Sequence, residues 1–492
     1  MRTFIQNKSP AGAERENGAQ AMTCKRRPPG FACAASVVLV TFGAVTVPAV
    51  FGHARTEPLF LLAWLLAFPL CMRLGFSFSE LQEGMFGSMA RGLPSITFVL
   101  CVGAMVGLWN ASGTVAMVTK LCLSSVAPRY FMLMAFLISF GFTMLTGTSF
   151  GACGTVGVAL MGVGLSMGMD PLAVASPIIG GAFFGDAFSP LSVSPNLAAS
   201  SAGVDLLKSI RHQATVTVPA LIVAGGVFCV WGSCLHSGAA DLSLIVSVTE
   251  GIGGAYKTGL VALVPLAVVL VMLLMKVPSI LSLLAGTASG FLLSWLYQGH
   301  SFRDTVSFMW SGFVLSSDSA FLNRIFSRGG ITGMDSAVFM TVLAFGLFGL
   351  LSTAGVIDAI MAPLAKKMRS RSAAMLCTVL LGFLANVTSA SCNFSYVFVG
   401  NLLRPVYEKN GFSRWELTRS MTVGCLFCGL LIPWNSNPIT VCGFLDVDPA
   451  QMIPFMFPTY IMFAVLVIVT VAGADQSFRK TARGEDSSDA KE

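Results

Sequence analysis

Long apolar runs recur along almost the whole chain, separated by short polar or basic segments. Most approach the roughly 20 residues that an α-helix needs to cross the hydrocarbon core of a bilayer. The clearest runs are 31–51, 58–76, 94–109, 130–145, 214–234, 259–275, 279–296, 337–353, 373–385 and 452–472. Shorter, interrupted apolar pieces fill 151–186, 386–403 and 422–435. The pattern predicts an all-α polytopic membrane protein with about 12 transmembrane helices.

Two polar blocks interrupt the apolar sequence in the first half of the chain. One reads T-G-T-S-F-G-A-C-G-T-V-G from Thr146, and the other reads G-D-A-F-S-P-L-S-V-S-P-N from Gly185. In lipid, unwound backbone is tolerated only where it is buried in protein or lines a watery cavity. Segments interrupted by Gly and Pro at membrane depth are the best sequence indication of a transporter's binding site. We therefore expect discontinuous helices at 146–157 and 185–196 that contribute to a transport site.

The same order of features recurs in the second half. A long span ends at Ser112-Gly113 in one half and at Ala354-Gly355 in the other, and further broken motifs follow at 386–395 and 431–438. Paired interruptions in corresponding positions are typical of inverted-repeat carriers. The predicted parts are a tail (1–30), first helices (31–93), transport repeat 1 (94–235), connecting helices with a polar connector (236–335), transport repeat 2 (336–473) and a second tail (474–492).

Composition agrees with a membrane protein, because only 11% of the residues are charged, against about 25% in a typical soluble domain. The net charge of +7 arises from clusters beside the apolar runs, at 25–27, 366–371 and 479–483. The positive-inside rule places these clusters, and both termini, in the cytoplasm. The polar segment before residue 31 is too long for a secretory signal. We expect a multi-pass protein of the cytoplasmic (inner) membrane, in contact with the lipid bilayer and not with nucleic acid; whether it forms a homo-oligomer stays open.

Other chemistries lack the residues that they need. The 13 Cys are mostly scattered through apolar segments, and the C-x-x-C at Cys425 has no second pair or nearby His to complete a metal site. A membrane serine protease needs a His base in a span, and an aspartyl protease needs a second carboxylate in a matching motif. We therefore predict neither an enzyme nor a bound cofactor. A channel stays open as an alternative, because broken helices also line pores, although their pairing favours alternating access.

Six motifs together resemble one known family. They are G-A-M-V-G-L-W-N-A-S-G-T-V from Gly103, T-G-T-S-F-G from Thr146, G-A-F-F-G-D-A-F-S-P-L-S from Gly181, D-L-L-K-S-I-R-H from Asp205, L-N-R-I-F-S-R-G-G-I from Leu322 and L-I-P-W-N from Leu431. In order and spacing, between about Gly92 and Gly473, they are similar to the NhaC-type Na⁺/H⁺ antiporters of the ion transporter superfamily. The resemblance implies a secondary active transporter that exchanges sodium and protons by alternating access.

A site for such exchange needs oxygen ligands and a titratable group. Sodium is a hard cation that prefers oxygen, and a carboxylate removed from water binds its proton more tightly, so that proton and cation compete. Asp186 is the only acidic residue inside the broken motifs; Asp170 and Asp358 are weaker candidates, and Asp186 as a helix cap stays open. The expected ion- or substrate-binding residues are Asp186, Thr146, Thr148, Ser149, Ser189, Ser192, Asn196, Asn386, Ser389, Asn393, Trp434 and Asn435. Na⁺ and H⁺ are the expected coupling ions.

The chain also departs from the pattern that it resembles. Val193 stands where the family pattern has Asp after S-P-L-S, the segment from Ser389 to Cys392 lacks the family's Asp, and Thr422-Val423 replaces a Glu-Asp pair. Fewer carboxylates lower the repulsion of an anionic substrate. The alternative function is therefore ion-coupled exchange of a small organic anion, such as a carboxylate, sulfonate or amino acid. Half-helix N-termini and the amides of Asn196, Asn393, Asn435 and Asn437 are the groups expected to hold it.

Overall fold

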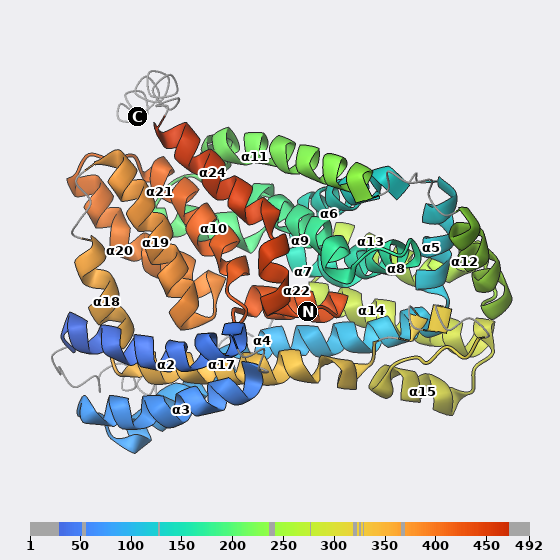
Figure 1. Cartoon of the computed structure of the whole chain (residues 1–492), viewed down its shortest axis with the longest axis horizontal. Helices are drawn as coiled ribbons and strands as arrows, with labels where there is room; N and C mark the ends of the chain where they lie inside the picture. Colours follow the sequence, from blue (N-terminus) through green and yellow to red (C-terminus); the bar gives the residue numbers. More distant parts are fainter. Residues whose placement is uncertain are drawn as a thin grey trace, which may run out of the picture.

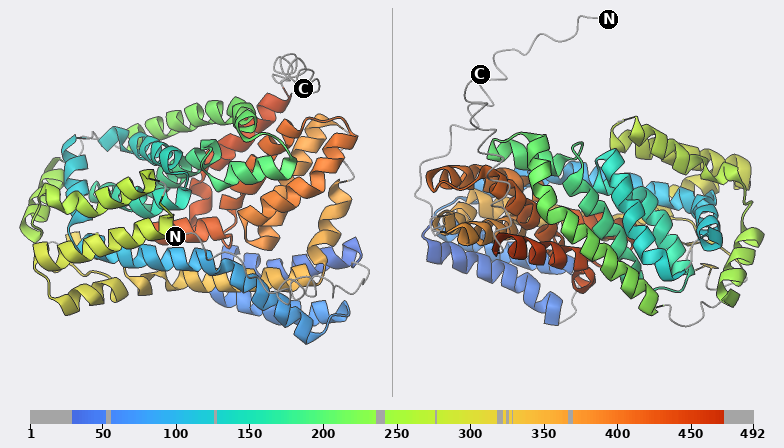
Figure 2. Two further views of the ribbon diagram at one scale, coloured as in Figure 1. Left: turned by 180° about the vertical axis from the view of Figure 1, so that it is seen from behind. Right: turned by 90° about the horizontal axis from the view of Figure 1, so that it is seen from above.

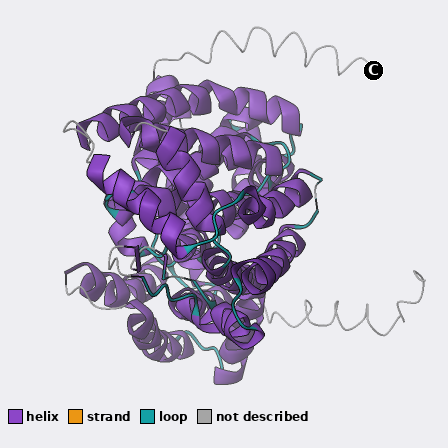
Figure 3. Ribbon diagram, turned by 90° about the vertical axis from the view of Figure 1, so that its right-hand side faces the viewer, coloured by secondary structure: helices purple, strands orange, loops and turns teal. Residues whose placement is uncertain are grey.

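The computed structural model describes residues 29–51, 56–125, 128–235, 242–275, 277–317, 322–323, 326–327, 329–365 and 370–471. Within these ranges the regular structure is helical throughout, without a strand (Figure 3). Most of the basic residues that predict the orientation, at 25–27, 366–369 and 479–483, lie outside the described residues.

The helices divide into a first half, a second half and connecting elements. The first half contains α4 (Phe78–Ala111), α5 (Thr114–Ser125), η1 (Pro128–Tyr130), α6 (Phe131–Thr146), α7 (Ser149–Ala152), η2 (Cys153–Gly157), α8 (Val158–Ser166), α9 (Pro171–Phe188), α10 (Val193–Ala202) and α11 (Leu206–Leu235). The second contains α17 (Asp335–Thr353), α18 (Val356–Ala365), α19 (Arg371–Ser389), α20 (Cys392–Lys409), α21 (Arg414–Met421), η6 (Thr422–Phe427), η7 (Cys428–Leu431), α22 (Ser436–Leu445), α23 (Pro449–Met452), η8 (Ile453–Phe455) and α24 (Phe457–Val471). The other elements are α2 (Phe31–Phe51), α3 (Thr56–Arg73), α12 (Leu242–Ala255), η3 (Leu260–Leu263), α13 (Val264–Leu274), α14 (Ser279–Leu292), η4 (Leu293–Gln298), α15 (Phe302–Ser311) and η5 (Ile331–Met334).

Several helices are long and apolar enough to cross a membrane. Among the described residues there are seven such helices, or up to 10 spans when each of three bent pairs counts as one, and two shorter apolar helices, Phe31–Val45 and Phe131–Thr146, add to them. One bent pair joins Arg414–Leu431 to Ser436–Leu445 at 51°. The protein is therefore a multi-pass α-helical membrane protein, as the sequence predicts.

One helix is much longer than its apolar run. The sequence pattern starts a span at 94, but α4 starts at Phe78, because Ser77 and Glu80 form a reciprocal capping box that fixes the first turn. Glu80, Glu83 and Arg91 break the hydrophobic pattern in this part of the helix without breaking its backbone. Figure 1 shows α4 running beside α17 along the length of the molecule, on the side opposite α11 and α24, and Figure 2 shows the same arrangement from behind.

Close helix packing sets the position of the first helix break. A Cβ added at Gly181 of α9 would lie 2.1 Å from the carbonyl oxygen of Phe136 in α6, so only glycine permits this approach. The same holds one turn later, where a Cβ at Gly185 would lie 2.6 Å from Cβ of Thr143. The contact of α6 with α9 brings the C-terminal ends of both helices together.

The broken segments of the two halves have matching backbone geometry. The C-cap residues that follow α6 and α19 are Gly147 (φ 73°) and Ala390 (φ 52°), both in the left-handed region. The next residues, Thr148 and Ser391, are extended N-caps whose side chains accept a bond from the amide three residues later. The breaks after α6 and α19 therefore have the same local backbone turn.

Candidate functional site

The two breaks of the first half are joined by hydrogen bonds. The hydroxyl of Ser189 donates to the carbonyl of Met144 at 3.0 Å, and the hydroxyl of Ser192 donates to the carbonyl of Gly147 at 3.0 Å. Met144 lies in the last turn of α6 and Gly147 directly follows it, where carbonyls have no amide partner within the helix. The short segment between α9 and α10 is thereby fixed against the break between α6 and α7.

Asp186 lies where these two breaks meet, in the last turn of α9, and is 7% exposed. The Ser149 hydroxyl donates to Oδ2 of Asp186 at 3.0 Å, and the single Ser192 hydroxyl proton is shared between Oδ1 of Asp186 and the Gly147 carbonyl. Ser149 begins α7, and Ser192 is the N-cap of α10, so two helix N-termini lie beside the carboxylate. The positive ends of their dipoles favour its negative charge. The N-cap of α9 itself is Asp170, whose carboxylate accepts from the amides of Leu172 and Ala173.

A cavity of about 410 Å³ opens onto Asp186. Its wall is formed by Thr146, Gly147, Thr148, Ser149, Phe150, Asp186, Leu191, Ser192, Val193, Ser194, Leu273, Val277, Pro278, Asn393 and Asn437. Both halves contribute, because Asn393 belongs to the first turn of α20 and Asn437 to the first turn of α22. Among these wall residues Asp186 is the one ionisable side chain. The cavity therefore combines one carboxylate with hydroxyls, amides and the N-termini of four helices.

The corresponding break of the second half is neutral. Asn435, the N-cap of α22, donates from Nδ2 to Oδ1 of Asn386 at 2.9 Å and accepts from the thiol of Cys392 at 3.5 Å. The amide of Asn386 also donates to the backbone carbonyls of Gly424 and Cys425 in η6. These side chains satisfy one another and the backbone within the protein. They stabilise the shape of the second break without adding charge.

The structure brings half of the predicted residues together. Those that line the cavity are Asp186, Thr146, Thr148, Ser149, Ser192 and Asn393. Those outside its wall are Ser189, Asn196, Asn386, Ser389, Trp434 and Asn435.

The residues outside the wall bond mostly to nearby backbone. Asn196 donates to the carbonyls of Pro190 and Ser192, and the Ser389 hydroxyl donates to that of Ser391. Trp434 donates to the carbonyl of Val387 at 2.9 Å, and its ring stacks on Phe42 with centroids 5.5 Å apart. Their position supports a role in holding the breaks in shape.

Sequence reasoning missed one side of the cavity. Leu273, Val277 and Pro278, at and after the end of α13, form this apolar side. The run that contains α13 is uniformly apolar, so no sequence signal sets it apart from a lipid-facing span. Ser194 could have been found, because it lies inside the S-P-L-S-V-S-P-N motif and lines the cavity.

Comparison with known proteins gives concordant matches. The Na⁺/H⁺ antiporter family model matches residues 30–215 and 181–474. A malate-2H⁺/Na⁺-lactate antiporter of Bacillus subtilis (strain 168) is 30% identical over 411 residues, covering 84% of this chain and 88% of the relative. The Na⁺/H⁺ antiporter NhaC of the same strain is 30% identical over 415 residues, covering 84% and 91%. The arginine/ornithine antiporter ArcD of Halobacterium salinarum is 26% identical over 397 residues, covering 80% and 82%.

Proposed function

Because the chain belongs to the NhaC-type Na⁺/H⁺ antiporter family, we propose that Asp186 is the group at which Na⁺ and H⁺ replace each other during antiport. The observation that carries this proposal is the position of Asp186, buried at the junction of two helix breaks and open to a cavity. An unneutralised carboxylate is energetically costly inside the membrane-spanning part of a protein. Asp186 is therefore expected to bind either a proton or a cation, because each neutralises its charge.

The surroundings of Asp186 offer the remaining ligands that sodium requires. The hydroxyls of Ser149 and Ser192 donate to the carboxylate and keep lone pairs for a cation. Thr146 and Thr148 add hydroxyl oxygens to the same wall. Hard oxygen donors of this kind match the preference of a hard cation.

We further propose that 94–235 and 336–473 act as two inverted repeats in the cytoplasmic membrane, with both termini in the cytoplasm. Paired discontinuous helices support the first point, because such pairs surround the binding site in repeat-built carriers. The basic clusters beside the spans support the second. The site would then be exposed alternately to the two sides by motion of one repeat against the other.

The test is transport in proteoliposomes with an imposed Na⁺ or pH gradient, comparing Asp186→Asn with the parent. Asn keeps the shape and removes the titratable charge, so Na⁺-driven proton movement should be lost. Asp170→Asn is the matched control, because Asn caps a helix as well as Asp does and Asp170 lies outside the cavity wall. Equal responses of parent and Asp186→Asn to both gradients would refute the proposal.

A second function is favoured by the helix N-termini around the cavity. α7, α10, α20 and α22 all begin at its wall, and such termini bind carboxylate oxygens. Exchange of a small organic anion is thus compatible with the site, and one relative is a malate/lactate antiporter by name. Proteoliposomes loaded with malate or lactate distinguish anion exchange from Na⁺/H⁺ antiport. If labelled anion is taken up only when the same proteoliposomes contain internal anion, the second function is supported. Na⁺/H⁺ exchange without such uptake contradicts it.

A further inference from the structure

Gln213 of α11 connects the helix that carries Asp186 to the second half of the protein. Its side chain is 2% exposed. Nε2 donates to the carbonyl of Ala187 at 2.9 Å, and Oε1 accepts from the hydroxyl of Thr422 at 3.0 Å. Both ends of the amide are thus used, one by each half.

The first of these bonds satisfies the end of α9. Ala187 directly follows Asp186, and α9 ends at Phe188. The two amides that a helix would offer to the Ala187 carbonyl do not reach it, because Pro190 has no amide proton and the amide of Leu191 donates to Ser189 Oγ instead. Gln213 supplies the missing donor. It therefore holds in place the turn that presents Asp186.

The second bond reaches the element that shapes the opposite break. Thr422 is the first residue of the π-helix η6, which continues through η7 to the break before α22. Asn386 donates to two carbonyls of the same π-helix. π-helical turns mark sites where a helix is locally rearranged, often for function. Gln213 is thus hydrogen-bonded to both η6 and the end of α9, beside the direct ring contact of Phe184 in α9 with Phe427 in η6.

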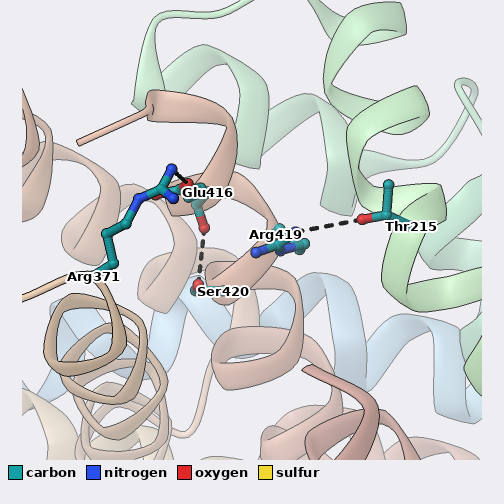
Figure 4. Close-up of polar contacts among 5 residues, drawn as sticks. All are labelled: Thr215, Arg371, Glu416, Arg419 and Ser420. Atoms are coloured by element: carbon teal, nitrogen blue, oxygen red, sulfur yellow. Dashed lines mark hydrogen bonds and ion pairs between the residues drawn. The ribbon is translucent and has the colours of Figure 1, made fainter. Parts of the chain in front are cut away.

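Two other side-chain contacts join α11 to α21 without touching α9. The Ser209 hydroxyl donates to that of Thr418 at 3.0 Å. Arg419 donates to the hydroxyl of Thr215 at 3.4 Å, as Figure 4 shows. On its other side α21 is held to α19 by the ion pair of Glu416 with Arg371, also drawn in Figure 4. The packing of α11 on α21 therefore does not depend on Gln213 alone. The effect of Gln213 on α9 can therefore be measured separately from its effect on the packing of α11 against α21.

We propose that Gln213 is a positioning residue for the exchange, which keeps Asp186 in register with η6 and so couples the ion at Asp186 to the arrangement of the second break. The inference rests on the proposed role of Asp186. Gln213 acts through the backbone of its neighbour and touches no transported ion. Loss of the Gln213 side chain should change the affinity for Na⁺ and H⁺ and the coupling of Asp186 to the second break. The effect on folding should be smaller.

The experiment compares Gln213→Leu, Gln213→Glu and Ser209→Ala in proteoliposomes, measuring half-saturating Na⁺ and the pH profile of exchange. Gln213→Leu should raise half-saturating Na⁺ by roughly fivefold or more, the lower end of usual coupling between sites, and displace the pH profile. Gln213→Glu should exchange like the parent at low pH, because a protonated carboxyl keeps one donor and one acceptor. As the pH rises and the carboxyl loses its proton, this variant should lose exchange. Ser209→Ala, which removes a link of α11 to α21 and leaves the bonds to α9 and η6 intact, should match the parent in both measurements.

Thr422→Val provides a second variant that leaves the bond to Ala187 intact, should Gln213→Leu fail to fold. It should shift half-saturating Na⁺ in the same direction. If the Gln213 and Thr422 variants show the Na⁺ dependence and pH profile of Ser209→Ala, Gln213 only packs the helices and the inference is wrong. Asp186→Asn, measured alongside, separates the two ideas. Full exchange in Asp186→Asn overturns the proposed function, whereas loss of exchange there with unchanged Gln213 variants overturns only the positioning role.

Discussion

Two residues occupy equivalent left-handed positions, and only one of them is glycine. A non-glycine residue in this region costs about 1–2 kcal/mol. A Cβ on Gly147 (φ 73°) would also lie 2.7 Å from Cβ of Leu191, whereas Ala390 (φ 52°) already carries its Cβ. We expect Gly147→Ala to lower the thermal unfolding midpoint in detergent and Ala390→Gly to raise it. Intrinsic fluorescence during heating measures both.

Gly141 is the control for the first substitution. It lies inside the same helix α6, and a Cβ there meets nothing within 4 Å. Gly141→Ala should stabilise the helix by about 0.5–1 kcal/mol, because alanine loses less backbone freedom on folding. Equal midpoints for Gly141→Ala and Gly147→Ala would contradict the left-handed turn at Gly147.

At the residue scale, the sequence identifies Asp186 but cannot say which side of a break each polar residue faces. Thr146 and Ser389 each directly precede the left-handed residue of a break, yet only Thr146 lines the cavity. Asn386 is buried among carbonyls of η6, and these contacts arise from chain segments that are distant in sequence. The neighbours of a buried polar group depend on tertiary packing, so the local sequence pattern does not predict them.

At the element scale, two caps of the same geometry separate stability from transport. Thr148 accepts from the amide of Gly151 and Ser391 from that of Phe394. Removing either cap by Ala should destabilise the protein by about 1 kcal/mol. Only Thr148 also lines the cavity, so only Thr148→Ala should raise half-saturating Na⁺. Paired measurements of unfolding and exchange on both variants check this, and an equal effect of Ser391→Ala on exchange would count against Thr148 as a ligand.

The elements themselves were largely predictable, since apolar runs and Gly/Pro interruptions reflect constraints of the bilayer. α4 shows the limit. Its first turns contain Glu80, Glu83 and Arg91, so hydropathy alone hides them. The S-F-S-E sequence at Ser77 does contain the capping signal. A search for caps as well as apolar runs would have placed the start of this helix correctly.

At the scale of the whole molecule, the breaks after α6 and α19 share a backbone turn but differ in charge. The residue at the position of Asp186 in the second half, counted from the left-handed residue of each break, is Gly429. A Cβ there would lie 2.7 Å from the Cys392 sulfur and 3.3 Å from Nδ2 of Asn386. Thiol and amide thus fill the space that a carboxylate would need. Of these two breaks, one is charged and the other is neutral.

One carboxylate in the cavity wall limits the charge that each cycle carries. If Asp186 alternately holds one Na⁺ and one H⁺, the exchange moves no net charge and should not respond to membrane potential. Moving one elementary charge across the membrane changes the free energy by about 2.3 kcal/mol per 100 mV. Net charge movement would therefore make the exchange rate depend measurably on a membrane potential set with K⁺ and valinomycin in proteoliposomes. Val193 is 58% exposed in the cavity wall, so Val193→Asp should add a second cation site and make exchange potential-dependent, while Val193→Asn should not. Potential-dependent exchange in the parent would show that a single carboxylate does not set the ratio.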